Sequence, residues 1–251
     1  MNDIIFGGQS LNRHGFAVRH FPVHTVGQRD MEFRQLYGRS GDLIRSNRRF
    51  SNVEMTYEIN TFDLKYLQNK ALLERDLIDL LLSTDGYQRF EDSTVPDYFT
   101  NAVCTSVGEI FTNHLNGYLS TSVTFSRVPF WYAKTGQEPV SYSLFDNNYI
   151  LQNPEKYEAL PLIRIKTDAD HTTLVVNNAE YNIYFPENGM AIELDAETMQ
   201  ASNGSTDMNA YITGDYFPTL RSGMNTIRLW KRSSAAAELE EFTIIPRWRR
   251  L

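Results

Sequence analysis

The sequence contains almost no cysteine and no long apolar run. Cys104 is the only cysteine among 251 residues, so the chain cannot form an intrachain disulfide, as expected of a protein that folds in a reducing compartment. Because residues 103–107 alternate like a strand, we interpret Cys104 as a buried structural thiol. No run of 18 apolar residues occurs, and no basic segment precedes an apolar one near Met1. We therefore expect no membrane span, no signal peptide and synthesis in the cytoplasm.

Positive charge is scarce but locally concentrated. The chain has 24 Lys and Arg against 31 Asp and Glu, a net charge of −7, which argues against nucleic acid as the main partner. Six arginines nevertheless fall within one short segment: Arg29, Arg34, Arg39, Arg45, Arg48 and Arg49. The simplest interpretation is a solvated face. The more specific one is an interface in which this basic segment meets an acidic face of a neighbouring subunit.

Motifs of catalysis and metal binding are also missing. The sequence has no Gly-x-Ser-x-Gly elbow, no Walker loop and no dinucleotide fingerprint. The histidines are His14, His20, His24, His114 and His171. Pro22 would break any helix that carried His20 and His24 on one face, so we interpret the histidines as loop residues. We expect no metal, no cofactor and no enzymatic activity.

Two groups of residues allow a second interpretation. Asp195 and Glu197, with Glu187 and Glu193 nearby, could form the carboxylate pair of a glycosidase or a calcium site, but the outer face of a strand and its turn explains them better. The aromatic run 130–132 and the surface-prone Trp230 and Trp248 could stack on a sugar. We favour a core or a subunit interface for them.

Alternating polarity dominates the first half of the chain. Residues 52–60 and 118–126 each alternate strictly, which predicts half-buried antiparallel strands. Residues 4–6, Gly7-Gly8 and residues 16–18 suggest an opening hairpin. One helix is predicted over 63–82, with Thr61 or Asp63 as its cap. Its apolar stripe comprises Leu64, Leu67, Ala71, Ile78, Leu81 and Leu82, widened by Leu73, Leu77 and Leu80.

The second half contains strands separated by turns. Strands are expected at 162–166, 174–176, 181–185, 226–230 and 239–245, with turns at Asn177-Asn178, Asn188-Gly189 and Asn203-Gly204. This spacing is typical of a β-sandwich. The loose, turn-rich stretch 129–153 indicates a boundary. We predict a mainly β protein with an N-terminal β-sandwich domain over 1–135, which carries the helix, and a second β-sandwich over 136–251.

Several stretches, taken in order, resemble the distal tail protein family of siphophages. The opening from Phe6-Gly7-Gly8 to His14-Gly15-Phe16 is similar to that of the family, and so is the glycine-rich stretch 38–43. Residues 130–132 lie where the family closes its first domain. The second half matches at 175–178, 192–195, 217–225 and 246–249. The resemblance covers nearly the whole chain.

The resemblance implies a structural protein of the virion tail tip. Family members have an N-terminal belt domain and a C-terminal galectin-like β-sandwich. Six belts close into a ring that joins the tail tube protein to the tail-tip protein, with DNA passing through its channel and no membrane involved. The second domains are docking platforms for baseplate or receptor-binding proteins. For this chain, the resemblance implies a homo-hexamer, and a rotated head-to-tail contact closes into such a ring. The six-arginine segment could cross to an acidic neighbour there.

A galectin-like second domain raises the question of sugar binding. Galectin-type sites use a His, Asn, Arg and Trp set on adjacent strands, and His171, Asn182, Arg228 and Trp230 are the candidates here. Protein docking is nevertheless the preferred role of this domain. The alternative to a ring protein is a carbohydrate-binding module or a sandwich-fold glycosidase.

Overall fold

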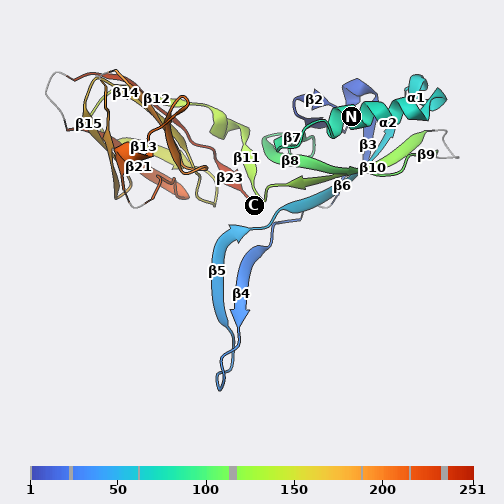
Figure 1. The fold of residues 1–251 in the computed structure, drawn as a ribbon, viewed down its shortest axis with the longest axis horizontal. Helices are drawn as coiled ribbons and strands as arrows, with labels where there is room; N and C mark the ends of the chain where they lie inside the picture. Colours follow the sequence, from blue (N-terminus) through green and yellow to red (C-terminus); the bar gives the residue numbers. More distant parts are fainter. Residues whose placement is uncertain are drawn as a thin grey trace. The chain divides into compact units, whose positions relative to one another are not determined.

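The structure, a computed structural model, describes residues 2–22, 25–61, 63–112, 118–187, 189–214, 216–232 and 237–251 (Figure 1). Its residues separate into two compact units, and the division falls between Trp131 and Tyr132. Both units are built mainly of antiparallel strands. The predicted mainly β fold is confirmed.

The first unit is organised around one large antiparallel sheet with the strand order β2-β1-β7-β8-β10-β6-β3. Its strands are β1 (Ile4–Phe6), β2 (Gln9–Ser10), β3 (Phe16–His20), β6 (Val53–Thr61), β7 (Gln88–Asp92), β8 (Tyr98–Val107), β9 (Phe111–Thr112) and β10 (Leu119–Arg127). The predicted alternation holds in β6 and β10, where alternate side chains are buried. The prediction of an opening hairpin is only partly confirmed. Gly7-Gly8 joins β1 to β2, whereas β3 pairs with β6 at the other edge.

This sheet curves strongly enough to enclose its own core. Phe6 on β1 and Phe125 on β10 are three strands apart in the sheet, about 14 Å if it were flat. Their ring centroids lie only 5.3 Å apart. Tyr57 and Phe90 pack into the same aromatic cluster. The two halves of the sheet therefore face each other across one core, as the layers of a sandwich do.

The predicted helix is divided in two. α1 spans Leu64–Gln68 and α2 spans Lys70–Leu81, and Asn69 adopts an extended conformation between them. Asp63 caps α1 through the Lys65 amide, as predicted, and Asn69 caps α2 through the Leu72 amide. No helix in the described part of the chain is long and apolar enough to cross a membrane.

The buried face of these helices differs from the predicted stripe. Leu73, Leu77 and Leu81 pack into the core of the first unit. Leu64, Ile78 and Leu82 are exposed. The stripe was predicted for one continuous helix, and the break at Asn69 changes which side chains face the sheet.

The second unit is a sandwich of a six-stranded and a five-stranded sheet, with orders β12-β22-β14-β17-β18-β19 and β13-β21-β15-β16-β20. The strands are β12 (Val140–Tyr142), β13 (Tyr149–Asn153), β14 (Leu162–Thr167), β15 (His171–Val176), β16 (Ala179–Tyr184), β17 (Ala191–Asp195), β18 (Gln200–Asn203), β19 (Thr206–Asp207), β20 (Ile212–Thr213), β21 (Gly223–Lys231) and β22 (Leu239–Ile245). The short strands β11 (Trp131–Ala133) and β23 (Arg249–Arg250) pair with each other.

Alternation along these strands forms the core between the two sheets. Ile163 and Ile165 of β14 are fully buried, as are Leu174 of β15 and Leu229 of β21. The turns at Asn177-Asn178 and Asn203-Gly204 join β15 to β16 and β18 to β19, as predicted. Asn177 adopts a positive φ of 57°, which asparagine tolerates better than most residues. The predicted turn at Asn188 falls outside the described residues.

Candidate functional site

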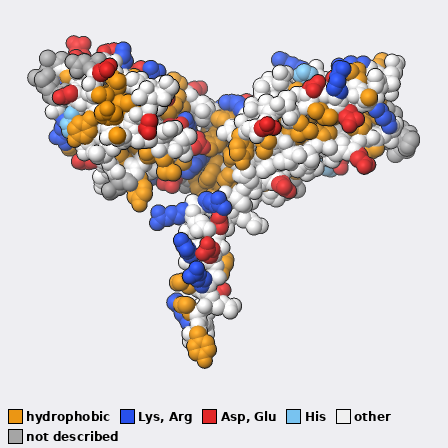
Figure 2. Space-filling view, in the orientation of Figure 1, with side chains coloured by type: hydrophobic (Ala, Val, Ile, Leu, Met, Phe, Trp, Pro, Cys, Tyr) orange, Lys and Arg blue, Asp and Glu red, His pale blue; other side chains and the backbone are white. Residues whose placement is uncertain are grey.

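All six arginines of the basic segment lie on one hairpin of the first unit. Its strands are β4 (Arg29–Arg34) and β5 (Leu43–Phe50), which pair only with each other and run away from the large sheet (Figure 1). Figure 2 shows arginine and hydrophobic side chains along this hairpin. Nearly every residue of both strands is exposed. A strand pair without a buried face gains little from its own chain, so we infer that it is built for contact with another molecule.

The glycine-rich stretch forms the tip of this hairpin. Gly38 and Gly41 have φ values of 75° and 89°, which glycine adopts without strain. The Arg39 amide donates to the Leu36 carbonyl oxygen at 3.2 Å. The stretch is therefore a tight connection between two strands.

Part of the positive charge is neutralised within the hairpin itself. The Arg49 Nε donates to Asp30 Oδ2 at 2.5 Å, and the Asn47 amide donates to Asp30 Oδ1 at 3.0 Å. These hydrogen bonds lower the pKa of Asp30. Arg45 lies 3.9 Å from Glu32. The segment 29–50 holds six arginines and three acidic residues, so it retains a net charge of +3.

Three arginines remain available for another molecule. Arg34, Arg39 and Arg48 lie near no carboxylate within 4.0 Å in the parts of the chain that the structure describes. Arg29 packs over the Phe50 ring at 5.4 Å. The six arginines were predicted as one interface set. The structure brings them onto one element, with only half of them unpaired.

Apolar side chains accompany these charges. Phe33 and Ile44 are directly opposite each other and are 58% and 60% exposed. The other exposed apolar residues of the hairpin are Met31, Leu36, Tyr37 and Leu43. Exposed apolar groups surrounded by charge are typical of a protein interface.

The hairpin is firmly held where it leaves the sheet. Arg127, at the end of β10, is 1% exposed and donates to the carbonyl oxygens of Val128, Pro129 and Thr25 at 2.8–2.9 Å. Gly27 allows a close approach, because a Cβ there would lie 2.5 Å from the Ser51 carbonyl oxygen. The base is therefore rigid although the strands beyond it are exposed.

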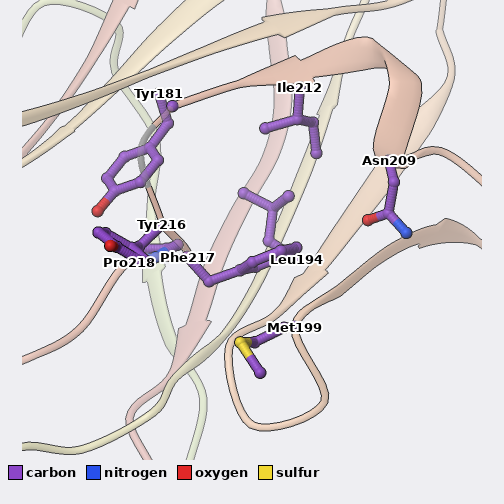
Figure 3. Close-up of a pocket in the computed structure, with 9 residues that line it drawn as sticks. Tyr181, Leu194, Met199, Asn209, Ile212, Tyr216, Phe217 and Pro218 are labelled. Carbon is purple, nitrogen blue, oxygen red and sulfur yellow. The ribbon is translucent and has the colours of Figure 1, made fainter.

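A second candidate surface lies in the second unit. A cavity of about 330 Å³ opens where strands β16 and β20 of one sheet approach β17 of the other (Figure 3). Its lining is mostly apolar: Tyr181, Leu194, Met199, Asn209, Ile212, Gly214, Tyr216, Phe217 and Pro218. Met199 and Tyr216 are 66% and 79% exposed at its mouth. These residues span 181–218 without a local motif, so the sequence did not indicate this cavity.

The candidate sugar residues do come together. His171 and Thr173 of β15 lie opposite Tyr184 and Asn182 of β16. Trp230 of β21 lies opposite Thr173 on the other side. Since directly opposed residues share one face of a sheet, His171, Asn182, Arg228 and Trp230 all project from the outer face of the five-stranded sheet.

The carboxylates considered for hydrolysis have structural partners. Arg247 binds Asp195 through two hydrogen bonds of 2.7 and 3.1 Å and approaches Glu197 at 3.4 Å. Glu197 also accepts a hydrogen bond from the Tyr132 hydroxyl. Burial alone would raise the pKa of Asp195, but the hydrogen bonds from Arg247 and two backbone amides outweigh it and lower that pKa. A carboxylate held in this way is a poor general acid.

The Asp195–Arg247 pair makes a testable contribution to stability. A lowered folded-state pKa stabilises the fold above the ordinary value of 3.8, and this contribution disappears as pH falls through the folded-state pKa. We expect Asp195→Asn to cost about 1 kcal/mol near pH 7. In thermal melts, the difference in stability between Asp195→Asn and wild type should become smaller below about pH 4. Asp97→Asn, at an exposed position, is the control. A stability difference between Asp195→Asn and wild type that does not change with pH would contradict the lowered pKa of Asp195.

Other residues singled out in the sequence have simpler positions. Cys104 is buried, and burial raises its pKa to about 11, as befits a structural thiol. Trp131, Tyr132 and Trp248 are buried, which agrees with the preferred core position over sugar stacking. His14 and His20 are exposed. His20 and His171 lie in strands β3 and β15, so the prediction of loop histidines was wrong for these two. His24 and His114 fall outside the described residues.

Comparison with known proteins finds a likeness to solved structures, not to known sequences. No family model matches the sequence, and no curated protein sequence matches it either. Solved structures do match over the entire chain. Two belong to the baseplate of phage P2 in its activated conformation, with Ca and with Sr. They are 11% and 12% identical, with TM-scores of 0.51 and 0.50 over 98% and 97% of those chains. At this level of identity the likeness is one of fold.

A third structure matches with a higher TM-score. The Dit protein of phage SPP1 aligns over 100% of both chains with a TM-score of 0.74 and 15% identity. That structure is described as a paradigm of the hub adsorption apparatus in phages that infect Gram-positive bacteria. The present chain therefore has the SPP1 Dit fold from end to end.

Proposed function

We propose that this protein is a distal tail protein of a phage, a structural hub rather than an enzyme. Six copies form a ring at the tail tip that joins the tail tube protein to the tail-tip protein, with DNA passing through the channel. The observation that carries this proposal is the exposed hairpin β4–β5, which projects charge and apolar surface from a rigid base. The fold shared with SPP1 Dit supports it.

The hairpin suits a head-to-tail contact between copies. Such a contact joins two different surfaces and closes into a ring when the rotation per copy is a whole fraction of a turn. The net charge of the segment is +3, whereas that of the whole chain is −7. The rest of each copy therefore carries −10, so a basic hairpin approaching its neighbour meets opposite charge.

Light scattering and negative-stain imaging of the purified protein test this proposal. We expect particles of six 29.0 kDa protomers and ring-shaped averages. A protein that stays monomeric at every concentration and in the presence of its tube protein would contradict the proposal. The carbohydrate-binding module, our alternative, predicts that monomer.

The second unit would act as the docking platform. Its apolar cavity, with Tyr216 and Met199 at the mouth, can receive one hydrophobic side chain of a baseplate or receptor-binding protein. We expect Tyr216→Asp to weaken binding of the phage's own adsorption protein by about tenfold or more, measured by biolayer interferometry. Met224→Asp, at a similarly exposed position outside the cavity, should bind like wild type. Equal loss in both variants would exclude the cavity as the docking point.

A further inference from the structure

The outer face of the five-stranded sheet in the second unit carries an unusual ladder of side chains. Arg228, Trp230 and Arg232 follow one another at every second position from β21 onward, so all three project from this face. The guanidinium carbon of Arg228 lies 4.9 Å from the centre of the Trp230 ring, and that of Arg232 lies 4.5 Å from it. Because they flank Trp230 on opposite sides along the strand, they cover opposite faces of the indole.

This ladder changes what the site can recognise. A tryptophan that binds a neutral sugar needs one free ring face for stacking, and here both faces are covered by cations. Within the described residues, no carboxylate lies within 4.0 Å of Arg228 or Arg232. The ladder therefore presents two uncompensated guanidinium groups, which are the preferred partners of carboxylates and phosphates.

Polar side-chain atoms on the ladder and beside it have no hydrogen-bond partner among the described residues. The Nε2 atom of His171, the Nε atom of Arg228 and the Nε1 atom of Trp230 are shielded from solvent and unpaired among the described residues. Leaving a buried polar atom without a partner costs free energy. A ligand that displaces the covering side chains would supply that partner. The Asn182 Oδ1 accepts from the Thr173 hydroxyl at 2.8 Å, which leaves the Asn182 amide group to donate.

A flat aromatic surface borders these donors. Tyr184 is 45% exposed and stacks on His171, with ring centroids 4.4 Å apart and an angle of 10° between the planes. One face of Tyr184 is thus covered by the imidazole, and the other is open for a sugar ring. Tyr184 and His171 are directly opposed, so they share the face that carries the ladder.

We propose that this acid-sugar face, formed by His171, Asn182, Tyr184, Arg228, Trp230 and Arg232, binds an acidic saccharide. The carboxylate or phosphate of the ligand pairs with the two guanidinium groups. Its hydroxyl oxygens accept from the Trp230 indole and the Asn182 amide, and a ring packs on Tyr184. An acidic peptide offers the negative charge but neither the hydroxyl oxygens nor the flat ring. The proposal is independent of ring assembly.

Isothermal titration calorimetry of the full chain tests this with tetragalacturonate and neutral maltotetraose. We expect the acidic tetrasaccharide to bind at least about tenfold more tightly, because charged hydrogen bonds contribute more than about 1.4 kcal/mol. The double variant Arg228→Gln with Arg232→Gln should lose this preference. Trp230→Phe, which keeps a ring between the guanidinium groups but lacks the N–H, should weaken binding about three- to tenfold. Arg221→Gln, an exposed arginine in the same unit, is the control.

Four results would overturn the proposal. They are equal binding of the neutral tetrasaccharide, no heat with either sugar at millimolar concentration, an equal loss in Arg221→Gln, and tighter binding of a tetraglutamate peptide or of inorganic phosphate than of tetragalacturonate. The last result would assign the face to acidic protein segments or to simple anions. Circular dichroism of each variant separates loss of binding from loss of fold.

Discussion

Replacing Phe33 and Ile44 together with aspartate is expected to leave the protein monomeric without weakening the protomer. Both side chains are more than half exposed and directly opposed on the hairpin. In an assembled ring they would be buried, and burying two unpaired carboxylates costs several kcal/mol per contact. We expect light scattering to give protomer mass at concentrations where the wild type assembles.

The control for this variant is Ile150→Asp. Ile150 is 65% exposed and lies on β13, outside the hairpin. It should assemble like wild type and melt within a few degrees of it. Normal assembly of the Phe33→Asp, Ile44→Asp variant would show that the hairpin is not the ring contact. A large loss of stability would show instead that the hairpin packs on its own chain.

Raising the salt concentration should weaken assembly less than the double substitution of Phe33 and Ile44 by aspartate does. Arg45 and Arg49 already have acidic neighbours in the hairpin, and Arg29 packs on the Phe50 ring. Arg34, Arg39 and Arg48 have neither kind of partner among the described residues. Exposed ion pairs contribute little and are screened by salt. Apolar burial would therefore supply most of the contact energy, while the arginines set the orientation of approach.

Strands with one buried face were predictable because their pattern has a single cause. In β6, the side chains Val53, Met55, Tyr57 and Ile59 all meet one core, so polarity alternates strictly. The hairpin β4–β5 was harder to predict, since neither face is buried by its own chain. Its signal lay in Gly38 and Gly41, which separate two short segments that carry both apolar residues and arginines. The break at Asn69 had a weak signal, because asparagine is tolerated within helices but favoured at caps.

The candidate functional sites could be predicted only in part, because they are formed by segments that are distant in the sequence. The residues of the acid-sugar face were chosen by residue type, and only the register of β15 with β16 and β21 shows that they share a face. Arg232 and Tyr184 were missed for the same reason. For Trp248, residue type alone left a core, an interface and sugar stacking open. Its burial results from close packing against Gly136, where a Cβ would lie 2.4 Å from the Trp248 backbone nitrogen.

Arg127→Met is expected to be the most destabilising single substitution in the first unit. The guanidinium of Arg127 is almost fully buried, and desolvation lowers its pKa to about 10, so it stays protonated at neutral pH. It supplies donors to three carbonyl oxygens that have few alternatives. Methionine fills much of the volume but removes these hydrogen bonds. The Val128 oxygen then keeps only the long contact from the Thr100 hydroxyl at 3.5 Å. We expect a loss of about 3 kcal/mol in urea unfolding, after the gain from removing a buried charge is subtracted.

The same substitution should loosen the base of the hairpin. The Thr25 carbonyl oxygen accepts from Arg127. Close by in the sequence, the Gln28 carbonyl oxygen accepts from the Ser51 amide at 2.9 Å. Without that anchor, the Ser51 amide should exchange with deuterium faster than in wild type, because local opening becomes easier. Arg89→Met removes a partly exposed ion pair with Glu91 and a cation–π contact with Phe99, and should change stability by about 1 kcal/mol or less. If Arg127→Met unfolds like Arg89→Met, the buried guanidinium does not hold the hairpin, and the rigidity on which a ring contact depends must arise elsewhere.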